Sequence, residues 1–188
     1  MDRRSRPATL GEQGPDSEAG TAMTTIERAG LTTRTAYVHD PPVPAASSVE
    51  PSVFVAVRWH YGTLLLVRRC DSGAWELPGG LVEVGQSAVA AAVRNTVDEA
   101  GVRVEITGFA GLFSDPRHVA CSTGGEVRQQ FALLFHARAL GGVPRGDQRR
   151  TSDAAWVKIA ELARLVMEPR ARIQVAEAVA VGEPPHLG

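Results

Sequence analysis

Residues 75–102 read WELPGGLVEVGQSAVAAAVRNTVDEAGV, and this stretch decides the fold. It begins with a short extended piece that is broken by Pro78 and two glycines, which permit unusual backbone angles and close approach of another group. Ser87 is a typical helix N-cap, and Gly101 is a typical C-terminal stop. The stretch therefore predicts a glycine-rich loop that leads directly into a helix ending one residue before Gly101.

Apolar residues recur at helical spacing along one side of this predicted helix: Val89, Val93, Val97 and Ala100. Such a stripe is typical of a helix that packs on a core. We therefore predict that this side is buried and that the opposite, polar side faces a ligand or solvent.

The polar side carries Asn95, Asp98 and Glu99, whose spacing places them side by side. Adjacent carboxylates repel, so the pattern indicates a bound cation, unless Arg94 alone offsets the charge on an ordinary solvated helix face. The loop before the helix favours the cation, because it can bring a backbone carbonyl and the Glu83 carboxylate toward the same side. Oxygen ligands of this kind suit Mg²⁺ or Mn²⁺, which can polarise a phosphorus centre and deliver an activated water.

Residues 80–102 resemble the Nudix box, whose pattern is Gly, five residues, Glu, seven residues, Arg-Glu, apolar, any, Glu-Glu, any, Gly, apolar. The spacing is complete, and Asp98 replaces a Glu by a shorter carboxylate. The positions that match outright are Gly80, Arg94, Glu99, Gly101 and Val102. Three positions depart from the pattern: Gln86 at the first Glu, Asn95 at the Glu after Arg, and Thr96 at the apolar position.

The resemblance covers about residues 50–180 and implies an α/β (α+β) fold in which a mixed β-sheet lies between helices. It also implies hydrolysis of the pyrophosphate bond in a nucleoside diphosphate linked to another moiety, such as an ADP-ribose-like compound, a nucleotide sugar or a nucleoside triphosphate. Glu99 and Asp98 are then the catalytic carboxylates, and Arg94 orients them. The expected ligands of Mg²⁺ or Mn²⁺ are the Gly80 carbonyl, Glu83, Asp98 and Glu99.

Asn95 introduces the main alternative, because an amide cannot accept a proton from water at neutral pH and is a weaker cation ligand than Glu. A catalytically weakened nucleotide-binding or regulatory module of the same fold is therefore the competing hypothesis. Relatives that split ADP-ribose-like compounds often place the general base on a later loop, which here offers Asp115, His118 and Glu126. We include Glu126 among the catalytic candidates, although solvated loop residues explain all three equally.

Four residues are candidates for substrate binding: Arg68, Arg69, Trp75 and Arg128. The arginines can hold phosphate, and the tryptophan can line a base pocket. Solvated arginines, a core tryptophan and the polar face of an alternating strand are the alternative interpretations.

Composition limits the remaining possibilities. The chain has 188 residues, 44% hydrophobic content and a formal charge of −1, which fits one globular core and gives no basic footprint for nucleic acid. A small molecule is the expected partner, and the resemblance makes a homodimer a further expectation. No apolar run approaches the roughly 20 residues of a membrane span, so we expect no membrane association and a cytoplasmic location.

The chain divides into a flexible N-terminal arm (1–50), a Nudix domain (51–182) and a C-terminal tail (183–188). The arm is rich in Pro, Gly, Ser and Thr, with a possible short strand near Tyr37. Alternating patterns predict strands at 53–59, 63–69, 102–113, 127–140 and 154–157, with a loop at 114–126. Helices are expected at 159–166 and 170–181, where an amphipathic partner-binding surface is a third, weaker reading.

Overall fold

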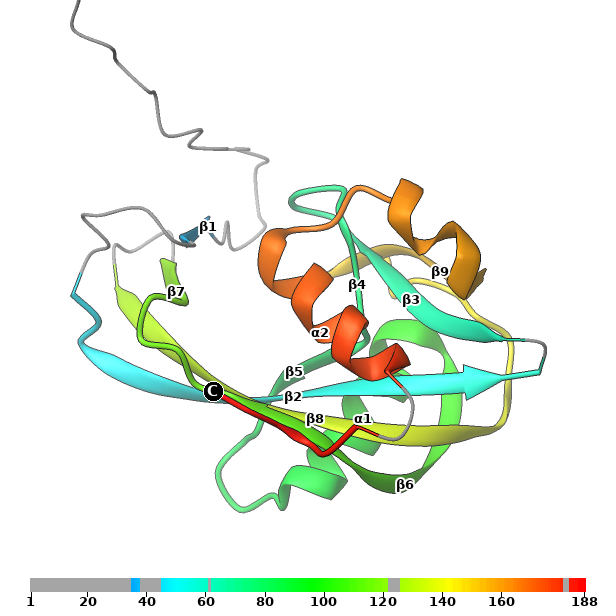
Figure 1. Ribbon diagram of the computed structural model, residues 1–188, viewed down its shortest axis with the longest axis horizontal. Helices are drawn as coiled ribbons and strands as arrows, with labels where there is room; N and C mark the ends of the chain where they lie inside the picture. The colour runs from blue at the N-terminus through cyan, green and yellow to red at the C-terminus, as the bar shows by residue number, and fades with distance from the viewer. Residues whose placement is uncertain (1–34, 38–44, 61, 122–125, 181–182) are drawn as a thin grey trace, which may run out of the picture.

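The computed structural model describes residues 35–37, 45–60, 62–121, 126–180 and 183–188 (Figure 1). Most of the predicted N-terminal arm lies outside these residues. The strands are β1 (Thr35–Tyr37), β2 (Ser48–Trp59), β3 (Thr63–Arg69), β4 (Trp75–Glu76), β5 (Gly79–Leu81), β6 (Val102–Phe113), β7 (Val119–Cys121), β8 (Val127–Gly142), β9 (Thr151–Lys158) and β10 (His186–Leu187). The helices are α1 (Ala88–Ala100), the 3₁₀ helix η1 (Ile159–Arg164) and α2 (Pro169–Val179).

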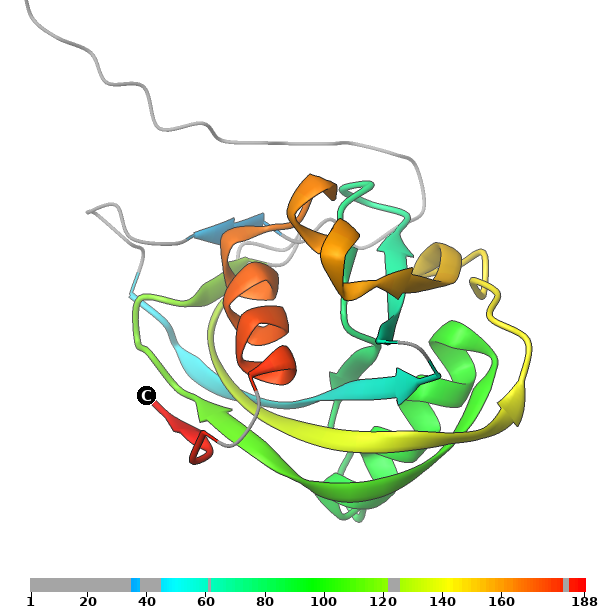
Figure 2. The ribbon, with the colours of Figure 1, turned by 45° about the vertical axis from the view of Figure 1, so that its right-hand side comes forward.

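The described strands form one mixed sheet. Its main path runs β1-β7-β8-β2-β3-β4, while β5 pairs with β2, β6 with β8, β9 with β3, and β10 with β6. The β2–β8 and β6–β10 pairs are parallel, and the others are antiparallel. Helix α1 lies on one face of the sheet, and α2 lies on the other (Figures 1 and 2). The fold class expected from the sequence is therefore confirmed.

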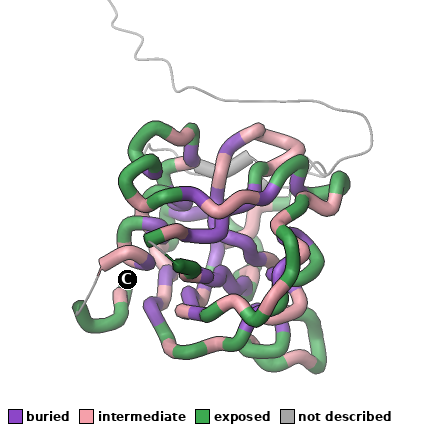
Figure 3. The backbone as a smooth tube through the Cα atoms, turned by 90° about the vertical axis from the view of Figure 1, so that its right-hand side faces the viewer, coloured by how far each residue is buried: buried purple, intermediate pink, exposed green. Residues whose placement is uncertain are grey.

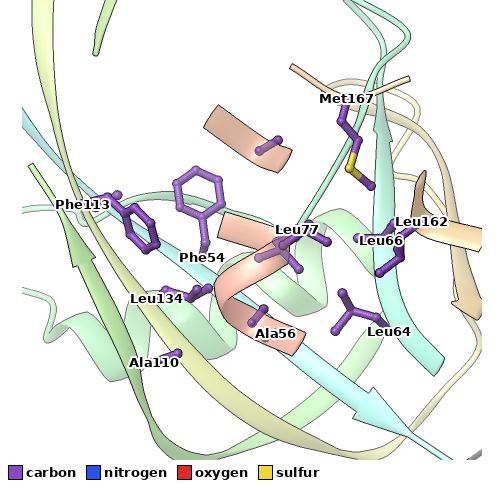
Figure 4. Packing of buried hydrophobic residues seen from close by; sticks show 14 of the residues in the cluster. Phe54, Ala56, Leu64, Leu66, Leu77, Ala110, Phe113, Leu134, Leu162 and Met167 are labelled. Carbon is purple, nitrogen blue, oxygen red and sulfur yellow. The ribbon is translucent and has the colours of Figure 1, made fainter. Parts of the chain in front are cut away.

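Both faces of the central strands are buried, which explains why residues 53–57 of β2 and 64–67 of β3 are continuously apolar. Even-numbered residues of β2, such as Phe54, pack beneath α2 and η1, whereas odd-numbered residues, such as Val55, pack beneath α1. Figure 4 shows Phe54 and Leu77 in the first of these layers, together with Met167. Burying each such side chain contributes about 1.5–3 kcal/mol. In Figure 3 the buried segments occupy the middle of the fold.

The boundaries of α1 agree with the prediction. The Ser87 hydroxyl accepts a hydrogen bond from the Ala90 N–H at 3.1 Å, and Gly101 ends the helix in the left-handed conformation with φ of 70°. A residue with a side chain is disfavoured in that conformation, so glycine provides the stop.

The predicted buried side of α1 was only partly right, because Ala100 is buried but two of the three valines are exposed. Val89 and Val97 are 48% and 38% exposed, whereas the buried positions are Ala91, Ala92, Asn95, Thr96, Glu99 and Ala100. The alanines are small enough to bring the helix close to the sheet, and each buried polar group has a hydrogen-bond partner. The Thr96 hydroxyl, for instance, donates to the Ala92 carbonyl at 2.8 Å, which accommodates a polar residue at an apolar position of the box.

Several other boundaries differ from the prediction. The predicted loop 114–126 contains β7, which is held by its pairing with the first residues of β8. The predicted tail contains β10, which adds to the edge of β6. The predicted helix 159–166 is the six-residue 3₁₀ helix η1.

The C-terminal helices do not present the amphipathic partner-binding surface of the third reading. Their apolar sides cover the core through Leu162, Ala171 and Val175.

Among the described helices, the longest has 13 residues, so none is long enough to cross a membrane, which takes about 20.

Candidate active site

The loop that enters the box is pressed against β2. Gly79 pairs with Phe54, and a Cβ atom on Gly79 would lie 2.3 Å from the Val53 carbonyl oxygen. Only glycine permits this close approach. It brings the Gly79 N–H to the Glu99 side chain, where it donates to Oε2 at 3.0 Å. The loop and the end of α1 are thus joined at one carboxylate.

Glu99 is 1% exposed and is the centre of the site. Its Oε1 atom lies 3.5 Å from Arg150 Nε and 3.8 Å from Arg69 Nη1. Burial raises the pKa of Glu99 to about 7, and the charge of Glu76 acts in the same direction, against the Gly79 N–H and the two arginines. The carboxyl group therefore exchanges between its neutral and charged forms near neutral pH, and a cation beside it would favour the charged form.

Arg69 joins this carboxylate to two others. Its Nη1 atom lies 3.5 Å from Glu76, and its Nε and Nη2 atoms donate to Asp71 at 3.3 and 3.1 Å. Burial opposes the charged form of Arg69, but the neighbouring carboxylates outweigh it and raise its pKa. Arg69, a predicted substrate-binding residue, is therefore brought to Glu99, with its guanidinium group already engaged by carboxylates.

Asn95 is part of the same buried surface, at 1% exposure. Its Nδ2 atom donates to the Leu81 carbonyl at 3.2 Å, and its Oδ1 atom accepts from Arg94 Nη2 at 3.2 Å. A Cβ atom on Gly80 would lie 3.2 Å from the Asn95 amide. A glutamate here would lack the donor and add a methylene group, so this departure from the box is integrated into the packing.

Arg94 ties the box loop to the helix. Its Nη1 atom lies 2.8 Å from Glu83 Oε2, and its Nη2 atom donates to the Leu81 carbonyl at 3.0 Å. The Glu83 side chain is 67% exposed and is paired with Arg94. Asp98 is exposed on α1, three residues after the buried Asn95. The structure thus brings Glu99 and Gly80 together with Asn95, links the exposed Glu83 to Asn95 through Arg94, and leaves Asp98 exposed.

The other predicted residues lie elsewhere. Arg68 donates to the Gly73 carbonyl in the turn between β3 and β4, and Trp75 packs against the core beneath α2. Arg128 pairs with Glu126 and Glu50 at the start of β8. The β2–β8 register places Arg128 opposite Ser48, six residues from the Gly79 contact on β2, or about 20 Å along the strand.

The loop candidates for a general base are also engaged locally. A hydrogen bond from Arg117 holds the pKa of Asp115 well below its usual range, despite a small opposing effect of burial. The His118 N–H donates to the Asp115 carbonyl, and the His118 carbonyl accepts from the Gln130 N–H. The described contacts do not connect Asp115, His118 or Glu126 to Glu99.

Sequence reasoning missed several residues around Glu99. Glu76 shares Arg69 with Glu99, and Arg170 lies 4.0 Å from Glu76 and over the Phe54 ring. Glu76 lies within residues 75–102. A charged residue in the short strand just before the box was the sequence signal that pointed to it. Arg150 comes from a loop about 50 positions away, and no local pattern indicated it.

The donor set fits a cation that completes its shell with water and phosphate oxygens. No group of three or more His, Cys, Asp or Glu side chains converges within the described part of the chain, so a closed protein cage is absent there. Glu99 supplies a hard carboxylate oxygen, and the Gly80 carbonyl is the backbone ligand expected from the box. Mg²⁺ is commonly bound by one or two carboxylates together with substrate phosphates, which matches this open arrangement.

Comparison with known proteins gives consistent results. A family model described as NUDIX domain matches residues 49–178. A MutT-like protein of Streptomyces ambofaciens is 33% identical over 148 residues, covering 78% of this chain and 88% of that protein. A putative 8-oxo-dGTP diphosphatase of Bacillus subtilis is 32% identical over 122 residues, covering 65% and 74%. The crystal structure of an ADP-ribose pyrophosphatase from Streptococcus suis superposes with a TM-score of 0.58 at 20% identity, covering 74% of this chain and 98% of that one.

Proposed function

The chain belongs to the NUDIX domain family, and on this premise we propose that it hydrolyses the pyrophosphate bond of a nucleoside diphosphate linked to another moiety, with Mg²⁺ or Mn²⁺ as its cation. ADP-ribose-like compounds, nucleotide sugars and nucleoside triphosphates form the substrate class. The similar proteins named putative 8-oxo-dGTP diphosphatase and ADP-ribose pyrophosphatase support a small nucleotide as the ligand.

The observation that carries the proposal is the position of Glu99. Its carboxylate is the surest metal ligand of the box, and it is fixed at the Gly79–Gly80 turn by a backbone hydrogen bond and flanked by two guanidinium groups. A carboxylate whose pKa is raised to about 7 and which is nearly inaccessible carries a cost when charged. A bound cation would offset that cost, which accounts for keeping such a group buried.

The reaction is a substitution at phosphorus. Water attacks one phosphorus atom, its oxygen forms the new P–O bond, and the bridging oxygen leaves with the other phosphate. The products are a nucleoside monophosphate and the phosphorylated second moiety. When the substrate is a triphosphate, they are a nucleoside monophosphate and pyrophosphate. The cation, when bound, supplies Lewis-acid polarisation of the phosphate and lowers the pKa of water. Glu99 would hold it, and Arg69 would keep the buried carboxylates from repelling one another.

Asn95 favours the second candidate, a nucleotide-binding module with weakened turnover. Its amide is buried and hydrogen-bonded, and it cannot act as a general base. General bases contribute about 10²- to 10⁴-fold to rate, so this one position separates an efficient enzyme from a binder.

The test is phosphate release from a panel of nucleoside diphosphate compounds and triphosphates, coupled to a phosphatase, with Mg²⁺ or Mn²⁺. Wild type is compared with Glu99→Gln. Glu105→Gln is the matched control, because Glu105 is a surface carboxylate paired with Arg138 on the sheet. We expect turnover that is lost in Glu99→Gln and kept in the control.

Absence of turnover in wild type on every compound would overturn the hydrolase proposal. Binding of the same compounds, measured by a shift in thermal unfolding, would then support the second candidate. Turnover that appears in Asn95→Glu would identify the missing carboxylate as the reason.

A further inference from the structure

A loop that the box does not include is docked on the end of α1. The Arg145 N–H donates to the Ala100 carbonyl at 3.0 Å, and the Thr151 hydroxyl donates to the Glu99 carbonyl at 2.8 Å. Within the loop, Asp147 Oδ1 accepts hydrogen bonds from three successive backbone N–H groups, those of Arg149, Arg150 and Thr151, at 2.8–2.9 Å. The loop therefore holds Arg150 in a defined place beside the site.

Arg150 differs from the other arginines of the cluster. The Arg69 side chain is 18% exposed and is engaged with three carboxylates, and the Arg170 side chain is 6% exposed. The Arg150 side chain is 46% exposed, and its Nε atom lies 3.5 Å from Glu99 Oε1 and 3.8 Å from Asp147 Oδ2. The guanidinium group therefore contacts Glu99 while its side chain is nearly half exposed, so a ligand beside Glu99 can reach it.

We propose that Arg150 binds the pyrophosphate group of the substrate directly. A guanidinium fork matches two phosphate oxygens at once, and this planar, permanently charged group is suited to that role. Arg150 contacts the carboxylate that would hold the cation, so its guanidinium group lies beside the place where the pyrophosphate group would be bound. This inference rests on the proposed function, since it names the residue that recognises the substrate's reacting group.

A role for Arg150 in binding phosphate also explains why the loop is held by so many hydrogen bonds. An arginine on an unconstrained loop would lose side-chain and backbone freedom upon binding, which weakens affinity. Asp147 removes much of that loss in advance by fixing the backbone on both sides of Arg150. Arg149 belongs to the same loop and carries the same charge, but its side chain has no contact with the site, which makes it a matched control.

The experiment measures binding of methylenediphosphonate, a pyrophosphate analogue that cannot be hydrolysed, by isothermal titration calorimetry with Mg²⁺. A hydrogen bond to a charged group is worth about 1.5–3 kcal/mol, so Arg150→Ala is expected to weaken affinity by about tenfold to 150-fold. Arg149→Ala is expected to stay within about twofold, since its charge is solvated. Arg150→Lys should recover only part of the loss, because an ammonium group lacks the fork.

A second comparison separates direct binding from an effect through Glu99. If Arg150 contacts the phosphate, Arg150→Ala weakens binding also in the Glu99→Gln background. Loss that disappears in that background would overturn the proposal, as would equal affinity of wild type and Arg150→Ala, or no binding to wild type. If binding depends on Arg150 but no compound is turned over, this inference is supported and only the hydrolase proposal is contradicted.

Discussion

Replacing Glu99 by Gln removes a buried carboxylate whose pKa is raised to about 7, and it should change how the stability of the protein depends on pH. Below the ordinary pKa of 4.5, the group is protonated in the folded and unfolded states alike, so its ionisation has no effect on stability. As the pH rises from 4.5 to about 7, the folded state binds more protons than the unfolded state, and wild type loses stability. Above that range the carboxylate is charged in both states.

The magnitude follows from the difference between the two pKa values. A pKa of about 7 against the ordinary value of 4.5 corresponds to about 3 kcal/mol of cost for the charged, folded form. Glutamine retains an oxygen for the Gly79 N–H and has no such cost. For a domain of this size, about 3 kcal/mol corresponds to roughly 6–12 °C in the midpoint of thermal unfolding.

The assay is thermal unfolding of wild type and Glu99→Gln at about pH 5 and about pH 8, with EDTA because a bound cation would offset the cost. We expect the midpoint of the variant, relative to wild type, to rise with pH. Asp98→Asn removes one carboxylate from an exposed neighbour on α1 and is the matched control for the loss of a negative charge. A difference between Glu99→Gln and wild type that is equal at both pH values would refute the reasoning.

Three further changes test the packing, each by denaturant unfolding. Ser87→Ala should cost about 1 kcal/mol by removing the cap of α1, and Ser87→Asn should restore most of it. Gly79→Ala should cost about 1–3 kcal/mol or more because its Cβ would meet the Val53 carbonyl, and an unchanged midpoint would contradict the register of β5 on β2. Gln174 is 1% exposed, and its two amide atoms have no hydrogen-bond partner among the described residues, so Gln174→Met should stabilise by about 1–3 kcal/mol. A destabilised Gln174→Met would show that the amide is satisfied.

Local sequence patterns predicted the helices and strands well where residues close along the chain determine the structure. The alternation in β6, together with Ser87 and Gly101 around α1, fixed boundaries that the structure confirms. β7 and β10 were missed because their two or three residues become strands only by pairing with β8 and β6. Short segments of this kind are determined by tertiary contacts rather than by their own composition.

The site was less predictable than the fold. The box spacing located Glu99, but the periodicity of valines assigned the buried side of α1 incorrectly, since alanines together with hydrogen-bonded Asn95 and Thr96 occupy it. Hydropathy patterns treat a buried polar residue as exposed, and an active-site helix is where that assumption fails. Arg150 is distant from the box in sequence, and only the fold brings it to Glu99.

The parallel pairing of β2 with β8 has a consequence for how the chain folds during synthesis. Ser48 pairs with Arg128 and Arg58 with Arg138, so each contact joins residues 80 positions apart. At about 5–20 residues per second, β2 is made roughly 4–16 s before its partner on the ribosome. During that time β2 can pair with β3 and β5, but its edge toward β8 is open, and its face beneath α2 and η1 stays uncovered until residues 159–179 are made.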